Sequence, residues 1–235
     1  MKKLAILLLA ATAMFASCAK ETAATDETAP PTKAEAGYAF GVAIGTSIKS
    51  TAVEIDYGTF VKGMKDVLEK GEAKLSQEAA EAIINRAIGA ALSKVGEANL
   101  AAEKAYFEEN AKKSGVFTTA SGLQYEIVSE GTGPKPLATD MVVVDYVGTL
   151  VDGTIFDSSL ARGAPLEIQL DQVIPGWTEG VMLMNKGSKY KLYIPSALAY
   201  GEQGAGGVIP PNATIIFDVE LMDILPPAAP ETTKP

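Results

Sequence analysis

The segment VIPGWTEG, residues 173–180, contains the only tryptophan of this 235-residue chain. A proline and a glycine precede Trp177, and the residues after it are predicted to be helical. A tryptophan in such a place has two interpretations. Either it fills the core between a helix and a sheet, or it is the floor of a pocket that holds an apolar, flat group. The neighbouring residues leave both interpretations open.

The absence of histidine narrows the chemistry of such a pocket. It excludes His-based catalytic triads, histidine general bases and histidine-containing metal sites. The segment GEQGAGGVIPP, residues 201–211, is rich in glycine but lacks the Gly-Lys-Ser/Thr pattern and the following helix of a phosphate-binding loop. We interpret this segment as a flexible flap over the pocket, and we predict neither a cofactor nor a metal.

Residues 1–20, MKKLAILLLAATAMFASCAK, have the layout of an export signal. Two lysines precede an apolar run that is too short to span a membrane, and small residues follow. Cys18 is the only cysteine, so an intramolecular disulfide is excluded. FASC resembles a lipoprotein cleavage box, in which the cysteine becomes the lipidated first residue, although Phe15 stands where the box prefers leucine. A signal cleaved without lipidation and a buried N-terminal helix are the alternatives.

Composition divides the rest of the chain. After a signal peptide at 1–17, we expect the lipidated cysteine and a flexible tether at 18–36, and a similar tail at 226–235, because both are small, polar and proline-containing. Residues 37–115 are rich in Ala, Glu and Lys, and they predict helices. The folded remainder is residues 116–225.

Two helices are predicted within 37–115. One follows Asp56 as its cap, and a longer one runs from Gln77 to Lys113 after a Ser cap, with Gly115 beyond its end. The longer helix would be roughly 55 Å long, so it must bend at a glycine or project as a stalk. The segment has few large apolar residues and would bury little core alone. We therefore expect it to form a homodimer through residues 37–113; a monomeric helical cap on the C-terminal domain is the alternative.

From Gly122 the pattern changes to strands. The segments LQYEIV, MVVVDYVGTL, LEIQL, KYKLYI and TIIFDVELMDIL alternate or run apolar, and turns rich in Gly and Pro separate them. VDGT, residues 151–154, predicts a hairpin. PGWTEGVMLM is the one helical insertion, with proline at its start. The predicted fold class is therefore α+β, with an all-helical N-terminal domain, a long connecting helix and an antiparallel sheet curled around one short helix.

A set of motifs in this second half resembles the FKBP-type peptidyl-prolyl cis–trans isomerases. The motifs are Y-x-G-x-L-x-D-G-x-x-F-D-S-S from Tyr146, V-I-P-G-W-x-E-G, A-Y-G and I-P-P-N-A-T, in order and at suitable separations over residues 120–225. More loosely, YAFGVAIGTSIKS and YGTFVKGMKDVL resemble the dimerisation domain of the bacterial macrophage infectivity potentiator and related periplasmic FKBP-type chaperones. The resemblance implies an FKBP-like fold and isomerisation of X–Pro bonds.

The resemblance also implies the site residues. The catalytic candidates are Tyr146, Phe156, Asp157, Trp177, Tyr200 and Phe217. The substrate-binding candidates are Val173, Ile174, Leu166, Ile209, Val208 and Arg162, with Leu198 as a flanking position. By the same resemblance, the Ile174 N–H and the Tyr200 hydroxyl bind substrate carbonyls. Asp157 either faces the twisting carbonyl carbon or braces Tyr146 and Arg162.

This reaction suits a chain without histidine, because rotation about an X–Pro bond breaks no bond and needs no proton, metal or nucleophile. The planar imide has charge-separated resonance that water stabilises, and the twisted transition state has lost it. A dry aromatic pocket therefore favours the twisted form.

We expect a prolyl isomerase with chaperone activity, lipid-anchored in the bacterial cell envelope, in the outer membrane and facing the periplasm or the cell surface. Its partners would be proline-containing unfolded or partly folded polypeptides. A net charge of −9 without a basic block argues against nucleic acid and against polybasic membrane adhesion. The alternatives are a non-catalytic module that binds Pro-peptides or unfolded proteins, and a surface interaction factor on the same fold.

Overall fold

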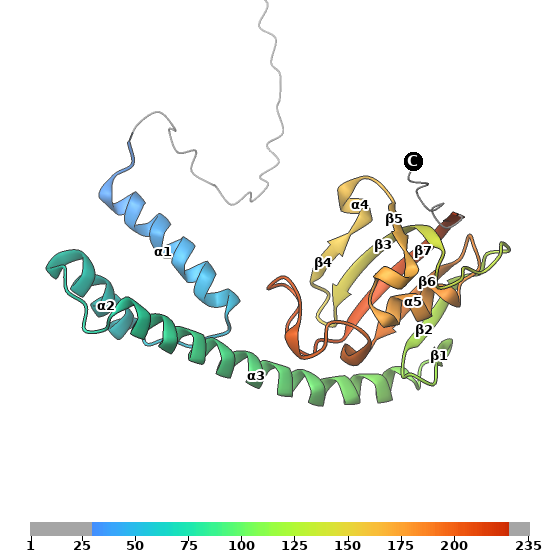
Figure 1. Ribbon diagram of the computed structural model, residues 1–235, viewed down its shortest axis with the longest axis horizontal. Helices are drawn as coiled ribbons and strands as arrows, with labels where there is room; N and C mark the ends of the chain where they lie inside the picture. Colours follow the sequence, from blue (N-terminus) through green and yellow to red (C-terminus); the bar gives the residue numbers. More distant parts are fainter. Residues whose placement is uncertain (1–29, 226–235) are drawn as a thin grey trace, which may run out of the picture. The chain divides into compact units, whose positions relative to one another are not determined.

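The computed structural model describes residues 30–225, and Figure 1 shows it in ribbon form. The expected signal peptide, the lipidated Cys18, most of the tether and the tail at 226–235 lie outside the described residues. The chain divides into two compact units, and the division falls between Ala43 and Ile44, inside the first helix. None of the described helices is both long and apolar enough to cross a bilayer.

The first two helices begin at side-chain caps. α1 spans Lys33–Ser50, and Glu35 donates its N–H to Thr32 Oγ1 while its carboxylate accepts from the Thr32 N–H. This is a capping box. The helix begins four residues before residue 37, where the helical domain was expected to begin, and it was not itself among the predicted helices. α2 spans Tyr57–Lys70, and Asp56 accepts from the Thr59 N–H at 2.7 Å, so the predicted cap is confirmed.

α3 spans Gln77–Asn110, a continuous helix of 34 residues and about 51 Å. Its predicted Ser cap is confirmed, because Ser76 Oγ accepts from the Ala79 N–H. The helix ends three residues before the expected Lys113. Asn110 is buried and donates to Gln124 Oε1 at 2.9 Å, and Gln124 in turn donates to the Phe107 carbonyl. These two hydrogen bonds join the end of α3 to the sheet.

The three helices leave most of their large apolar side chains exposed. Tyr38, Tyr57 and Leu68 have 78%, 77% and 82% of their surface in contact with solvent. The only buried residues that the described parts of these helices contain are Asp66, Gly96 and Asn110. As the composition predicts, this segment buries little core within one chain.

Seven antiparallel strands form the sheet of the second half. They are β1 (Val116–Thr118), β2 (Gln124–Ser129), β3 (Met141–Leu150), β4 (Ile155–Ser158), β5 (Leu166–Gln169), β6 (Lys189–Ile194) and β7 (Ile215–Leu225). Their order is β1-β2-β6-β7-β3-β4, and β5 pairs with the first half of β3. The VDGT hairpin is present between β3 and β4, where the Leu150 N–H donates to the Thr154 carbonyl. The sheet confirms the predicted fold class.

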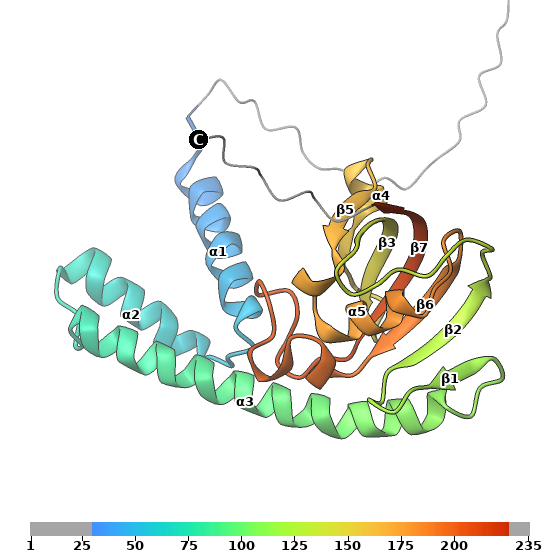
Figure 2. The same cartoon turned by 45° about the vertical axis from the view of Figure 1, so that its right-hand side comes forward.

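One helix packs on this sheet, and glycines allow its close approach. α5 spans Pro175–Met182 and lies against β6 (Figure 1 and Figure 2). A Cβ atom on Gly176 would lie 2.3 Å from Ile194 Cγ2, and one on Gly180 would lie 2.6 Å from Leu192 Cδ1. Only glycine fits at these two positions, which brings Trp177 close to the sheet. A second helix, α4 (Ser159–Arg162), has only four residues.

Candidate functional site

A cavity of about 350 Å³ opens between the sheet, α5 and the loop that follows β6. Its lining is mostly aromatic and aliphatic, with few polar groups. The lining residues are Tyr146, Phe156, Asp157, Leu166, Ile168, Gln172, Val173, Ile174, Trp177, Tyr200 and Phe217. Nine of the site residues expected from the sequence therefore lie around one cavity. Such a concave, largely apolar space with a few polar groups is typical of a small-molecule or peptide site.

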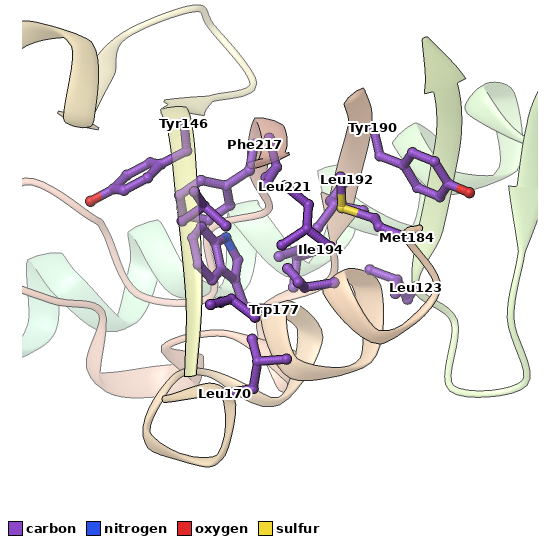
Figure 3. Packing of buried hydrophobic residues seen from close by; sticks show 14 of the residues in the cluster. Leu123, Tyr146, Leu170, Trp177, Met184, Tyr190, Leu192, Ile194, Phe217 and Leu221 are labelled. Carbon is purple, nitrogen blue, oxygen red and sulfur yellow. The ribbon is translucent and has the colours of Figure 1, made fainter. Parts of the chain in front are cut away.

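Trp177 both packs in the core and lines this cavity. It is only 4% exposed, and its ring meets the rings of Tyr146 and Phe217 edge-on, with centroids 5.3 and 5.4 Å away. Figure 3 shows the indole beside Phe217, at one end of the buried cluster. The two interpretations of the sequence are thus not exclusive. Trp177 fills the contact between α5 and the sheet, and part of its surface remains a boundary of the cavity.

Two phenylalanines form a corner of the cavity because the strand between them carries a glycine. In the sheet register, Gly148 of β3 lies opposite Phe217 of β7 and Asp157 of β4. A Cβ atom on Gly148 would lie 2.7 Å from both Phe156 Cζ and Phe217 Cε1. The two rings stand nearly perpendicular, 5.5 Å apart, in the space that a side chain at 148 would occupy.

A hydrogen-bonded group of three side chains lies at the polar rim. The Tyr146 hydroxyl donates to Asp157 Oδ2 at 2.5 Å, and Arg162 Nη2 donates to the Tyr146 hydroxyl at 2.6 Å. Arg162 Nη1 also donates to Asp157 Oδ1, which accepts a further bond from the Ser158 N–H at 2.8 Å. The guanidinium lies 5.3 Å from the centre of the Tyr146 ring. Arg162 therefore contacts the rim without lining the cavity itself.

These contacts set the charge state of the group. Burial acts to raise the pKa of Asp157, but the hydrogen bonds from Tyr146, Arg162 and the Ser158 N–H outweigh it and hold the pKa below its ordinary value. Burial and the hydrogen bond to Asp157 raise the pKa of Tyr146. At neutral pH the aspartate is therefore ionised and the phenol is protonated, so Tyr146 is the donor of their bond.

Tyr200 approaches the cavity from the loop between β6 and β7. It is 37% exposed, and its hydroxyl has no hydrogen-bond partner within residues 30–225. Burial raises its pKa above 10.0, so the hydroxyl stays protonated and can donate. Ile174 lines the cavity directly before α5, where its backbone is extended. A free hydroxyl beside an apolar cavity suits the recognition of a carbonyl oxygen.

The remaining expected residues lie outside the lining. Ile209 is 6% exposed and belongs to the buried cluster, where it pairs with Ala205 in an isolated bridge. Val208 is 58% exposed, and Leu198 packs against the core. Tyr200, directly before the segment 201–211 that was interpreted as a flap, lines the cavity, whereas no residue of that segment does.

Two lining residues, Ile168 and Gln172, were not among those expected. Ile168 is two residues after Leu166 on β5, so the alternation of a strand puts both on one face, and this signal is readable in LEIQL. Gln172 ends a three-residue 3₁₀ turn after β5. Nothing in the sequence around Gln172 indicates that position.

Two protein-family models match the described part of the chain. The family model described as FKBP-type peptidyl-prolyl cis-trans isomerase matches residues 133–222. The model of the domain amino terminal to it matches residues 33–127.

Individual relatives match most of the chain. The FKBP-type peptidyl-prolyl cis-trans isomerase FkpA of Aeromonas hydrophila is 47% identical over 83% of this chain and 77% of that protein. The outer membrane protein MIP of Legionella longbeachae is 37% identical over 92% of this chain and 97% of that protein. The crystal structure of FkpA from Escherichia coli has a TM-score of 0.64 and 39% identity, and the match covers 84% of this chain and 99% of that one.

Proposed function

Because the chain belongs to the family of FKBP-type peptidyl-prolyl cis–trans isomerases, we propose that the 350 Å³ cavity is the place where it accelerates rotation about X–Pro bonds. The observation that carries this assignment is the lining of that cavity. Three aromatic rings, those of Phe156, Trp177 and Phe217, meet edge-on around a space with room for a pyrrolidine ring.

The cavity supplies what this reaction requires. The barrier to rotation is roughly 18–20 kcal/mol and reflects the lost resonance of the planar imide. Transfer from water to an apolar cavity costs the planar, charge-separated form more than the twisted form, so the barrier falls. Trp177 is the floor on which the proline ring rests, and Phe156 and Phe217 are walls. The reaction transfers no proton, so the polar groups serve to orient the substrate.

Two groups are assigned to the substrate carbonyls, the Tyr200 hydroxyl and the Ile174 N–H. The assignment of the Tyr200 hydroxyl is supported by its exposure at the cavity and by its lack of a hydrogen-bond partner within the described residues. For Asp157 the contacts favour the role of a brace. Both of its oxygens already accept hydrogen bonds, from Tyr146, from Arg162 and from the Ser158 N–H. The brace orients Tyr146, whose ring touches Trp177.

A protease-coupled peptide assay on the full chain tests the cavity. Trp177→Leu and Phe217→Ala should each lower kcat/KM at least about tenfold, because the ring that contacts proline is lost. Tyr190→Leu is the matched control, since Tyr190 is equally buried, at 3% exposure, but lies outside the cavity. It should lower stability and leave kcat/KM near the wild-type value.

Two results would contradict the proposal. The cavity is the wrong place if Trp177→Leu and Phe217→Ala lower thermal stability alone and leave turnover intact. Wild-type protein that isomerises the peptide only at the uncatalysed rate would instead favour a module that binds Pro-peptides without catalysis.

We also propose that the chain is a homodimer through residues 37–113 and holds unfolded polypeptides. The exposed apolar side chains of α1 and α2, among them Tyr38, Tyr57 and Leu68, support this proposal, because a second copy would cover them. Sedimentation equilibrium should give twice the chain mass. Leu68→Glu should shift the equilibrium toward the single chain, and a wild-type protein that sediments as one chain at micromolar concentration would exclude the dimer.

The proposed location is the bacterial cell envelope, by a lipid on Cys18. The layout of residues 1–20 supports export, and a relative is named an outer membrane protein. Metabolic labelling with a fatty-acid analogue should mark the wild type and not Cys18→Ser. If neither protein carries the label, Cys18 is not lipidated, and the signal is cleaved without lipidation.

A further inference from the structure

The loop between β6 and β7 carries Tyr200, and both of its ends meet one carboxylate of α3. Glu103 Oε2 accepts from the Ser196 N–H at 2.6 Å and from the Thr214 hydroxyl at 2.9 Å, and Glu103 Oε1 accepts from the Ser196 hydroxyl at 3.2 Å. Ser196 stands two residues after β6, and Thr214 directly before β7. A single side chain therefore closes the base of the loop from outside the sheet.

A second group of contacts joins the same face of the helix to the same loop. Asn99 Nδ2 donates to the Pro211 carbonyl at 2.7 Å, and Asn212 Nδ2 donates to the Gly96 carbonyl at 3.4 Å. Positions 96, 99 and 103 follow the i, i+3, i+7 spacing of one helical face. A Cβ atom on Gly96 would lie 3.1 Å from Asn212 Nδ2 and 3.2 Å from Pro211 Cβ, so the helix and the loop approach closely at this glycine.

The contact continues from the helix to Tyr200 in two steps. Asn212, whose side chain is held by α3, has a left-handed backbone with φ of 52° and donates its N–H to the Gly201 carbonyl at 2.8 Å. Gly201 directly follows Tyr200 in the chain. The position of Gly201, and with it that of Tyr200, therefore depends on the end of the loop that the helix holds.

Five hydrogen bonds that involve side chains join α3 to this loop. A cavity of about 330 Å³ lies along it, bordered by Asn99, Glu103 and Thr214. Glu103 is half-buried and accepts three of these bonds. Removal of the Glu103 carboxylate would therefore take three of these hydrogen bonds from the base of the loop.

We propose that Glu103 is a positioning residue for the isomerase site. Although α3 precedes the segment that the isomerase family model matches, its carboxylate holds the loop that presents Tyr200 to the substrate. The last turns of α3 are then part of the catalytic unit. This proposal rests on the proposed function of the cavity, and its test is chosen to separate the two.

The test is the peptide assay on the full chain with Glu103→Ala. Loss of the three hydrogen bonds should lower kcat/KM about three- to tenfold, because the loop no longer holds Tyr200 in one place. Glu97→Ala is the matched control, since Glu97 is an exposed glutamate on the same helix. It should have wild-type kcat/KM. An effect of equal size in both variants, or in neither, would overturn the proposal.

A double-mutant cycle distinguishes positioning from a general loss of structure. In a Tyr200→Phe background, Glu103→Ala should cost less than about twofold, because the hydroxyl that it positions is already absent. In a Phe156→Leu background the full loss should remain, since Phe156 stands on β4 and leaves the Tyr200 hydroxyl in place. Equal losses in the two backgrounds would show that Glu103 acts on the fold as a whole and would contradict the proposal.

A milder variant covers the possibility that Glu103→Ala fails to fold. Thr214→Val keeps the shape of the buried Thr214 side chain and removes one of the three donors. It should lower kcat/KM in the same direction by a smaller factor, with an unchanged circular dichroism spectrum. Unchanged turnover in a folded Thr214→Val protein would count against Glu103. A wild-type protein without turnover would instead contradict the proposed function of the cavity.

Discussion

Gly148 has only a hydrogen atom at the point where the rings of Phe156 and Phe217 approach β3. Gly148→Ala would place a methyl group 2.7 Å from both rings. We expect one or both rings to move into the cavity, at a cost of about 1–3 kcal/mol in the free energy of unfolding. Turnover of a prolyl peptide should fall at least about tenfold. Urea denaturation and the peptide assay measure the two effects, and an active Gly148→Ala protein would show that the walls are not required.

The pH dependence follows from the groups around the cavity. The pKa of Asp157 is lowered, so its contribution to stability is present above its ordinary value of 3.8 and is lost as the pH falls through the folded pKa. The pKa of Tyr200 is raised above 10.0, so its hydroxyl remains a donor up to that pH. The chain has no histidine, so no such side chain titrates near neutrality. We expect kcat/KM to be constant between about pH 5 and 9. A bell-shaped profile centred near pH 7 would contradict the assignment of roles.

At the level of elements, replacing a glycine by alanine should have opposite effects on stability in α5 and in α3. Gly180→Ala should lower the free energy of unfolding by about 1–3 kcal/mol, because its methyl group would lie 2.6 Å from Leu192 Cδ1. Gly89→Ala is the matched control in the middle of an exposed helix, where a Cβ atom meets nothing within 4 Å. It should raise the helical stability by about 0.5–1 kcal/mol. The sign of the two changes, measured by urea denaturation, tests the packing of α5.

The sequence predicted those elements whose signal is local. Strands β3 and β6 have the expected bounds, because each is a run of alternating or continuous apolar residues between turns. The caps Asp56 and Ser76 are where side-chain chemistry places them. Strand β1 has three residues and β4 has four, too few to show a period of two. The end of α3 depends on the Asn110–Gln124 contact, which no local pattern contains.

The candidate site could be predicted only in part, for a similar reason. Most of the lining residues belong to motifs, and a motif can be read without the fold. Gln172 reaches the cavity because a 3₁₀ turn follows β5, and Ile209 is directed into the core by the bridge to Ala205. The link between Glu103 and Thr214 joins residues 111 positions apart, and its partners carry no distinctive local pattern.

At the level of the whole molecule, the binding of unfolded polypeptides and the isomerisation of prolyl peptides should be separable by mutation. Under the proposed dimer, Leu68→Glu should reduce the suppression of aggregation of a chemically denatured client, measured by light scattering. It should leave kcat/KM on a short peptide unchanged, since α2 contributes nothing to the lining of the cavity. Lys65→Gln changes the net charge by the same amount on an exposed position of α2 and is the control. Equal holding by the Leu68→Glu protein would contradict a role for the helices.

The length of α3 also determines how many residues of an extended client polypeptide could lie along it. A continuous helix of 34 residues is a stiff rod of about 51 Å, and an extended polypeptide advances about 3.4 Å per residue. A client chain that runs alongside the whole rod must therefore supply about fifteen residues. Under the proposed holding function, a tetrapeptide can report on the catalytic pocket alone. Longer substrates should gain affinity stepwise once their prolines are separated from an apolar stretch by that many residues.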